Sequence, residues 1–319
     1  MAQYAEKQPI GVLAALSAGF DTVTRQLWLI LLPAALDVFL WLGPRLKAAN
    51  LWPLVAFTIP DGLDTQTRLF AQDLQQTFQE TFTSFNWLSF LRPTLLGVPG
   101  LMDGTQTALP DGLGSMEWQV GSPLALLFAI ILMTVIGIGL GGLYWSLIAR
   151  QARDERIDWG AVVGRMTLIW PRLIGLALFI LGLLLGIWLA AVLISAMLGG
   201  TLGFIGALVV MLALSSMIWV LFYVTFGLHG IVLYNQRVLD AVRASFQLGR
   251  RHFWSVFGMI VAAFAVELGL GLIWRLAPPD SWLWAVSIVA DAFVVAGVSM
   301  ATMLFYMDRV TIPSSAVLA

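Results

Sequence analysis

Residues 173–198 read LIGLALFILGLLLGIWLAAVLISAML, and residues 202–228 read LGFIGALVVMLALSSMIWVLFYVTFGL. Each run lacks charged residues and is long enough, as a helix, to cross a hydrocarbon core about 30 Å thick. Only Gly199-Gly200-Thr201 separates the two runs, so we predict an antiparallel hairpin of two membrane spans. The alternative, one fused helix, would be too long to span the membrane once.

The composition of the whole chain also indicates that most of it lies in lipid. Of its 319 residues, 60% are hydrophobic and only 11% are charged, whereas a soluble domain carries about 25% charged residues. So few charges cannot cover the surface of a water-soluble fold of this size. Lipid is therefore the expected solvent for most of the chain.

Four more apolar runs of similar length predict further spans. The first of them follows a long segment with Lys7, Asp21 and Arg25, unlike the compact basic front of a cleavable signal peptide, so we expect it to be retained. The prediction is an all-α polytopic helix bundle that forms a single membrane domain over residues 1–319. The six expected spans are Leu27–Leu46, Leu124–Ile148, Leu173–Leu198, Leu202–Leu228, Phe253–Trp274 and Trp282–Met307.

Basic residues set the expected orientation, because connections rich in lysine and arginine stay in the cytoplasm. Residues 48–123 hold Arg68 and Arg92 against seven acidic residues, a formal charge of −5. We therefore predict a multi-pass protein of the cell membrane with both termini cytoplasmic and an extracytoplasmic insertion at residues 48–123. The two basic connections carry Arg150, Arg153, Arg156, Arg165 and Arg172 after the second span, and Arg237, Arg243, Arg250 and Arg251 after the fourth.

Three spans follow a short amphipathic stretch that ends in arginine, namely Ile10–Arg25, Ile157–Arg172 and Val238–Arg251. In the last stretch apolar residues recur every four positions, the spacing of a helix that lies in the membrane interface. The chain is therefore predicted to contain three repeats, each an interfacial helix followed by a helical hairpin. The first repeat differs because the insertion separates its two spans.

Within the insertion, Phe70, Leu74, Phe78 and Phe82 lie four residues apart among glutamines and threonines. This spacing predicts a helix with a narrow apolar stripe. Glycines and prolines punctuate residues 94–123, which we expect to form a loop. Nothing else in the chain is expected to project far into water, so the insertion is the predicted surface for a partner.

Residues 238–248, VLDAVRASFQL, and residues 250–254, RRHFW, form a short recognisable segment. It resembles the alanine-rich segment that precedes a span in a bacterial membrane-protein superfamily, which includes the membrane domain fused to some glycerophosphodiester phosphodiesterases. The resemblance implies a six-helix fold in a bacterial inner membrane. It does not imply phosphodiester hydrolysis, because that activity belongs to a separate soluble barrel for which this chain has no segment.

Three acids interrupt the apolar runs: Asp37 in the first, Glu267 in the fifth and Asp291 in the sixth. An ionised carboxylate at that depth costs several kcal/mol, so an intramembrane acid predicts function by default. Counted from the span ends, each acid lies about 12 to 15 Å inside the outer boundary, so the three can share one layer. Two interpretations stay open. One is a proton or cation site that faces a cavity, and the other is a set of protonated or hydrogen-bonded carboxyls that only fix helix packing.

Five arginines beside the amphipathic stretches predict contacts with anionic lipid headgroups, although topology alone also explains them. They are Arg165, Arg172, Arg243, Arg250 and Arg251.

Small residues four apart, such as Gly182 and Gly186, predict close helix packing or the seam of a homo-oligomer. Glycines are denser between Gly137 and Gly142, which we interpret as a bend or a point of lipid access.

Several classes of site are not expected. A net charge of −1 provides no basic field for nucleic acid, and the absence of cysteine excludes disulfides, thiolate metal sites and a cysteine nucleophile. His229 and His252 alone are too few ligands for a metal, and we expect them to make polar contacts at the membrane boundary. The sequence therefore predicts no catalytic residue, no metal and no cofactor.

These features favour a non-enzymatic accessory or assembly subunit that binds membrane lipid, a membrane-protein partner or a second copy of itself. The alternative is a transporter or channel that uses the intramembrane acids, since internal repeats are common in transporters. An intramembrane enzyme has no positive support in the sequence.

Overall fold

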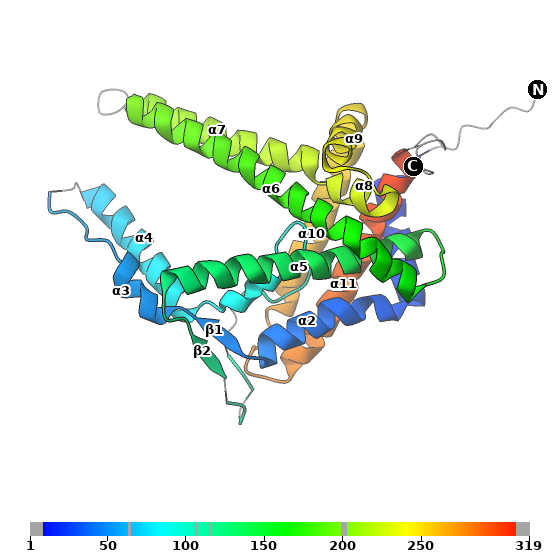
Figure 1. Cartoon of the computed structure of the whole chain (residues 1–319), viewed down its shortest axis with the longest axis horizontal. Coiled ribbons are helices and arrows are strands. Elements are labelled where there is room, and N and C mark those ends of the chain that lie inside the picture. The colour runs from blue at the N-terminus through cyan, green and yellow to red at the C-terminus, as the bar shows by residue number, and fades with distance from the viewer. Residues whose placement is uncertain are drawn as a thin grey trace, which may run out of the picture. The chain divides into compact units, whose positions relative to one another are not determined.

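The computed structural model describes residues 9–62, 65–105, 108–110, 112–114, 116–198 and 203–310 (Figure 1). The protein is an all-α bundle, as the apolar runs predict, because a helix satisfies its backbone hydrogen bonds without water. The predicted connection Gly199-Gly200-Thr201 lies outside the described residues. The α-helices are α1 Val12–Arg25, α2 Leu31–Leu42, α3 Trp52–Val55, α4 Thr65–Ser84, α5 Pro123–Ala152, α6 Trp159–Met197, α7 Gly203–Val224, α8 Gly227–Tyr234, α9 Val238–Arg251, α10 Phe253–Trp274 and α11 Leu283–Arg309; the 3₁₀ helices are η1 Leu27–Ile30, η2 Ala49–Leu51 and η3 Trp87–Leu91; the strands are β1 Arg45–Lys47 and β2 Glu117–Gln119.

Within the described residues, five helical stretches are long and apolar enough to cross a membrane, so the chain is a multi-pass membrane protein. They are α5, α6, α10, α11 and the stretch Phe204–Tyr234, which contains most of α7 and all of α8. A sixth span is present if α1 and the helical segment Leu27–Leu42, which meet at 97°, are counted as one bent span.

The first expected span, Leu27–Leu46, is shorter in the structure. Its helix ends at Leu42, and Gly43 is extended, with φ −77° and ψ −174°. The residue before a proline avoids the helical conformation, so Pro44 accounts for this end. Residues 45–47 then form strand β1 instead of the last turn of a helix.

Two of the three amphipathic stretches form separate helices. α1 ends at Arg25, and α9 ends at Arg251, where His252 (φ −126°, ψ 40°) leaves the helical conformation before α10 begins. The predicted separate helix at Ile157–Arg172 is wrong, because α6 continues unbroken past Pro171. The second repeat thus lacks the separate helix that was predicted for it, and the internal repeat as a whole stays a prediction.

The buried side of α6 explains why that helix is continuous. Val162, Ile169, Leu173, Leu176 and Ile180 are buried, and their separations of seven, four, three and four residues follow one helix face. The buried residues before and after Arg172 lie on the same face of the helix. A break at Arg172 would therefore expose the buried residues at the start of α6. At 1.5 Å per residue, α6 is about 58 Å long, nearly twice the hydrocarbon core.

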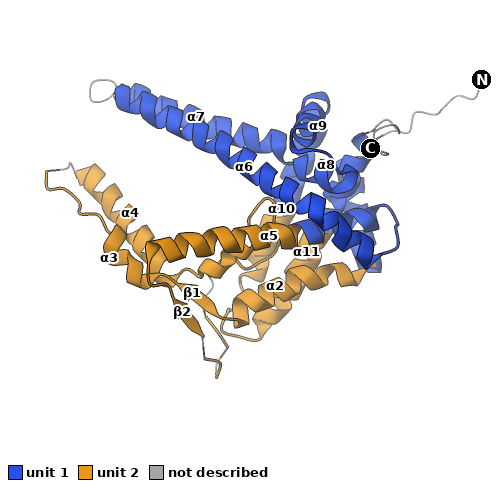
Figure 2. Ribbon diagram, in the orientation of Figure 1, with its two compact units in different colours: residues 1–25, 142–265, 297–319 blue, residues 26–141, 266–296 orange. Residues whose placement is uncertain are grey.

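The chain divides into two compact units, coloured blue and orange in Figure 2. Unit 1 comprises residues 1–25, 142–265 and 297–319, and unit 2 comprises residues 26–141 and 266–296. Each unit is thus assembled from segments that lie far apart in the sequence.

In unit 1, α6 packs along α7, and α8 packs on α9. α1 meets the C-terminal part of α11 at a close backbone contact. A Cβ on Gly19 would lie 2.5 Å from the carbonyl oxygen of Gly297, and a Cβ on Gly297 would lie 2.5 Å from the ring of Phe20. Glycine at both positions is what permits these two helices to approach so closely.

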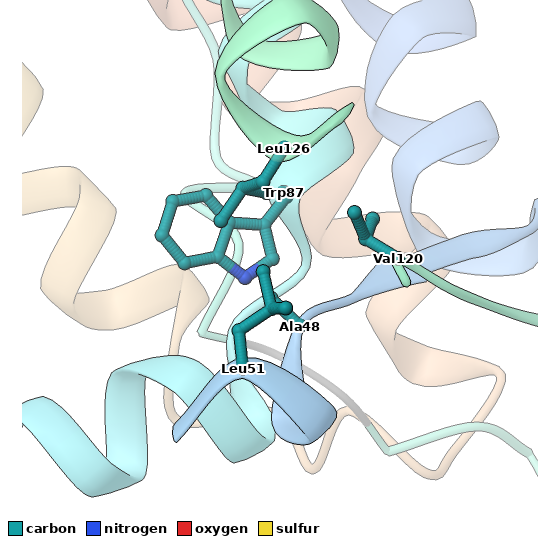
Figure 3. Close-up of a cluster of buried hydrophobic side chains, with 5 residues drawn as sticks. All are labelled: Ala48, Leu51, Trp87, Val120 and Leu126. Atoms are coloured by element: carbon teal, nitrogen blue, oxygen red, sulfur yellow. The ribbon is translucent and has the colours of Figure 1, made fainter. Parts of the chain in front are cut away.

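In unit 2, the insertion has its own small core, shown in Figure 3. Strands β1 and β2 pair in parallel, with Arg45 opposite Glu117, and so join the beginning and the end of the insertion. The expected loop at residues 94–123 therefore contains a short strand. The core consists of Ala48, Leu51, Trp87, Val120 and Leu126.

The helix predicted from the apolar stripe of the insertion is confirmed as α4. Its last aromatic residue, Phe82, packs against the rings of Trp87 and Trp52, with centroid separations of 5.5 and 6.3 Å. No residue of α4 is fully buried. The C-terminal end of α4 is thus anchored to the core of the insertion, and the rest of the helix projects from it.

Candidate functional site

Asp37 is fully buried, and within the described part of the chain its carboxylate is hydrogen-bonded to the insertion. Its Oδ1 lies 2.6 Å from Nη1 of Arg92, while the amides of Leu101 and Met102 donate to its two carboxylate oxygens over 2.7 and 3.2 Å. Arg92 also donates to the carbonyls of Val98 and Met102. The ion pair is hydrogen-bonded on both sides, so Asp37 fixes the insertion to α2.

A second ion pair joins the insertion to the connection between α10 and α11. Nη2 of Arg275 lies 2.9 Å from Oδ2 of Asp103. Burial tends to raise the pKa of Asp103, but hydrogen bonds from Thr105 and the charge of Arg275 outweigh it and leave that pKa below its ordinary value. The pair therefore persists at neutral pH and is lost only when the pH falls through that lowered pKa.

Asp291 and Glu267 differ from Asp37 because neither has a basic partner within hydrogen-bonding distance among the residues that the structure describes. Asp291, in α11, is only 3% exposed, and its Oδ2 is buried without a hydrogen-bond partner among the described residues. Glu267 lies partly buried in α10. The charge of Asp291 interacts with those of Asp37 and Glu267, so the structure brings the three predicted acids into one region of unit 2.

In unit 1, three arginines gather at the C-terminal end of α8. Arg153 donates to the carbonyl of Leu233, Arg165 to that of Val232, and Arg172 to that of Asn235. Asn235 ends the helix in the left-handed conformation, with φ 54° and ψ 32°. The last carbonyls of a helix lack partners and carry partial negative charge, so cationic donors stabilise this end.

The remaining predicted headgroup contacts lie on α9. Arg243 is 74% exposed and lies 3.8 Å from Asp240 one turn earlier. Arg250 and Arg251 are exposed in the last turn. Of the five arginines, Arg165, Arg172 and Arg243 thus have partners within the protein, while Arg250 and Arg251 are exposed. Lipid binding by these five residues stays a prediction.

The segment at residues 238–254 uses its Ser-Phe pair to hold the end of α7. The hydroxyl of Ser245 donates to the carbonyl of Tyr223 over 2.6 Å, and the ring of Phe246 packs 4.9 Å from that of Tyr223. Because α7 ends at Val224, the Tyr223 carbonyl is one of those that the helix leaves without a partner. Ser245 satisfies it.

His229 lies in α8, five residues before the end of the apolar stretch Phe204–Tyr234, and its position at the membrane boundary stays a prediction. It is 3% exposed, packs against the rings of Trp145, Phe226 and Tyr306, and has its Nε2 3.2 Å from the hydroxyl of Thr302. His252 directly follows α9 and is exposed, and its polar contact at the membrane boundary stays a prediction.

Two site residues have roles that sequence reasoning missed. Arg92 pairs with Asp37 across 55 positions, and Arg153 caps α8 across 80 positions. A signal for Arg92 was present, because it is one of only two basic residues in an acidic insertion and stands between Leu91 and Pro93. An arginine in such apolar surroundings needs a buried acid as its partner.

Comparison of the chain with protein-family models, with curated proteins and with solved structures produced no match.

The two groups of arginines should respond differently to substitution. Arg172→Ala should lower the free energy of unfolding by about 1 kcal/mol, because the end of α8 loses a charged donor. Arg250→Gln with Arg251→Gln should leave stability within about 0.5 kcal/mol and lower the amount of anionic phospholipid that co-purifies. Unfolding in mixed micelles and mass spectrometry of bound lipid measure the two effects. The reverse pattern would show that α9 is structural and α8 binds lipid.

Proposed function

We propose that this membrane protein is a non-enzymatic accessory subunit that binds a protein partner through α4 of the insertion. The observation that carries the proposal is an anchored helix whose apolar stripe is left uncovered by the described residues of unit 2. Phe70, Leu74 and Phe78 are 63%, 37% and 49% exposed. Covering a phenylalanine or leucine side chain contributes about 1.5 to 3 kcal/mol, so this stripe is a strong potential contact.

The base of the insertion supports such a contact. The aromatic core around Trp87, the Asp37–Arg92 pair and the Asp103–Arg275 pair hold the insertion at three separate places in unit 2. A helix presented from an ordered base loses less conformational freedom on binding than a mobile loop does.

Charge identifies the kind of partner. Asp73 and Glu80 lie on α4, Arg68 is its only basic residue, and glutamines and threonines occupy the rest of its surface. Such a helix is too polar for the hydrocarbon core and lacks the basic face of a helix that binds anionic lipid. A second copy would bring like charges together. The occupant that fits is a protein segment with apolar side chains flanked by lysine or arginine.

The orientation is part of the proposal, with the acidic insertion outside the cell membrane and both termini in the cytoplasm. The arginines of residues 150–172 support the cytoplasmic placement of the α5–α6 connection. We further propose membership in the bacterial superfamily that residues 238–254 resemble. The role of Ser245 in holding α7 supports a structural reason for that segment.

Single cysteines test the proposal, because the chain contains none of its own. With a photo-cross-linker on Leu74→Cys or Phe78→Cys, we expect one protein to be cross-linked in intact cells, and far less of it from Gln76→Cys on the opposite face. Adding Glu80→Lys should weaken the contact by about 1 kcal/mol, about fivefold. An impermeant thiol reagent should label Asn50→Cys and not Asp154→Cys.

Each outcome of this experiment discriminates between occupants. A cross-link that depends on both the face and the charge supports a cationic protein partner. Equal cross-linking from both faces, adducts with lipid only, or adducts with a second copy of this chain would each reject the proposal. Labelling of Asp154→Cys and not Asn50→Cys would reverse the orientation.

A further inference from the structure

Glu267 and Asp291 lie at similar distances from the connection between α10 and α11. Glu267 lies seven residues before the end of α10 at Trp274, and Asp291 lies eight residues after the start of α11 at Leu283. At 1.5 Å per residue, both acids are about 10 to 12 Å from the short connection that joins the two helices. They therefore stand at one level in neighbouring helices of unit 2.

The charges around this pair do not balance. Asp291 interacts with Asp37, Arg92 and Arg275 as well as with Glu267. Arg92 is already paired with Asp37 at 2.6 Å, and Arg275 with Asp103 at 2.9 Å. Once these two ion pairs are set aside, no described cation lies within ion-pair distance of Glu267 or Asp291.

The Oδ2 of Asp291 is buried without a hydrogen-bond partner among the described residues, and the whole residue is only 3% exposed. An ionised carboxylate in that position would cost several kcal/mol, and a bound proton removes that cost. Among the described residues no group of three histidine or acidic side chains is arranged to hold a metal ion.

We infer that Glu267 and Asp291 form a proton-binding site within the membrane domain, independent of the proposed partner surface. A hydronium ion from solvent transfers its proton to one carboxylate oxygen, a water molecule leaves, and no electron is exchanged. Because the charges of the two carboxylates repel each other, uptake of one proton by either carboxyl relieves the repulsion on both. Glu267 is the more exposed of the two residues.

Infrared difference spectroscopy on the purified protein tests the inference, because a protonated carboxyl has a carbonyl stretch that a carboxylate lacks. At neutral pH we expect the wild type to show one protonated carboxyl per chain more than the double variant Glu267→Gln, Asp291→Asn. Asp240→Asn, at an exposed position of α9, is the matched control and should leave the signal unchanged. Glu267→Gln alone provides a second test if the double variant does not fold, since its signal should differ from that of the wild type.

Two results would overturn the inference. The first is an equal carbonyl signal in the wild type and in every variant at positions 267 and 291. The second is loss of the wild-type signal on adding sodium or potassium chloride at constant pH, which would identify a metal-cation site. A carbonyl signal that requires both residues and does not change when salt is added supports the proton site.

Discussion

Arg92→Ala should destabilise the protein by about 3 to 5 kcal/mol, the largest loss that we expect from a single charge. The substitution leaves the Asp37 carboxyl buried with only two amide donors, and removing one partner of a buried ion pair is far more costly than the pair is favourable. The carbonyls of Val98 and Met102 lose their donor as well. Reversible unfolding in mixed micelles, followed by tryptophan fluorescence, measures the change.

A double-mutant cycle identifies the cause of this loss. In an Asp37→Asn background, Arg92→Ala should cost clearly less, because no charge is left behind when the guanidinium is removed. Arg68→Ala, at an exposed position on α4, removes the other arginine of the insertion and should change stability by less than about 0.5 kcal/mol. If Arg92→Ala costs the same in both backgrounds, the buried pair is not the reason.

The membrane spans could be predicted because lipid imposes a simple condition on the chain. Each spanning helix must be apolar over its whole length, so α10 was predicted with the bounds that the structure has. α4 was predicted for a related reason, since its stripe has the helical period in a polar background. Both features depend only on residues that are close in sequence.

The parts that could not be predicted depend on contacts between distant residues. The continuity of α6 is decided by what its buried face packs against, and a basic residue at position 172 carries no information about that. Asp37 is a second case, because its partner lies in the insertion and not in another span. Sequence reasoning placed Asp37, Glu267 and Asp291 in one layer, but it could not separate a satisfied acid from an unsatisfied one.

The glycines of α5 are a third feature that depends on contacts with distant residues. Their density suggested a bend or a point of lipid access, and that interpretation stays a prediction, although α5 runs unbroken from Pro123 to Ala152. A Cβ on Gly137 would lie 2.4 Å from the carbonyl oxygen of Leu91, and one on Gly142 would lie 3.0 Å from the side chain of Leu173. These glycines provide room for close packing against α5.

Gly141→Val should therefore lower the free energy of unfolding by about 3 kcal/mol. A Cβ at Gly141 would lie 1.9 Å from the carbonyl oxygen of Leu96 and 2.7 Å from the Cα of Gly97, and backbone atoms cannot move aside as a flexible side chain does. The turn at residues 93–97 would have to separate from α5, and it lies next to Arg92. Gly182→Val in α6 is the matched control, because nothing lies within 4 Å of its Cβ position, and it should change stability by less than about 0.5 kcal/mol. Equal losses in the two variants would mean that valine disturbs these helices through the backbone itself, whereas a loss confined to Gly141→Val would show that contact with the insertion determines it.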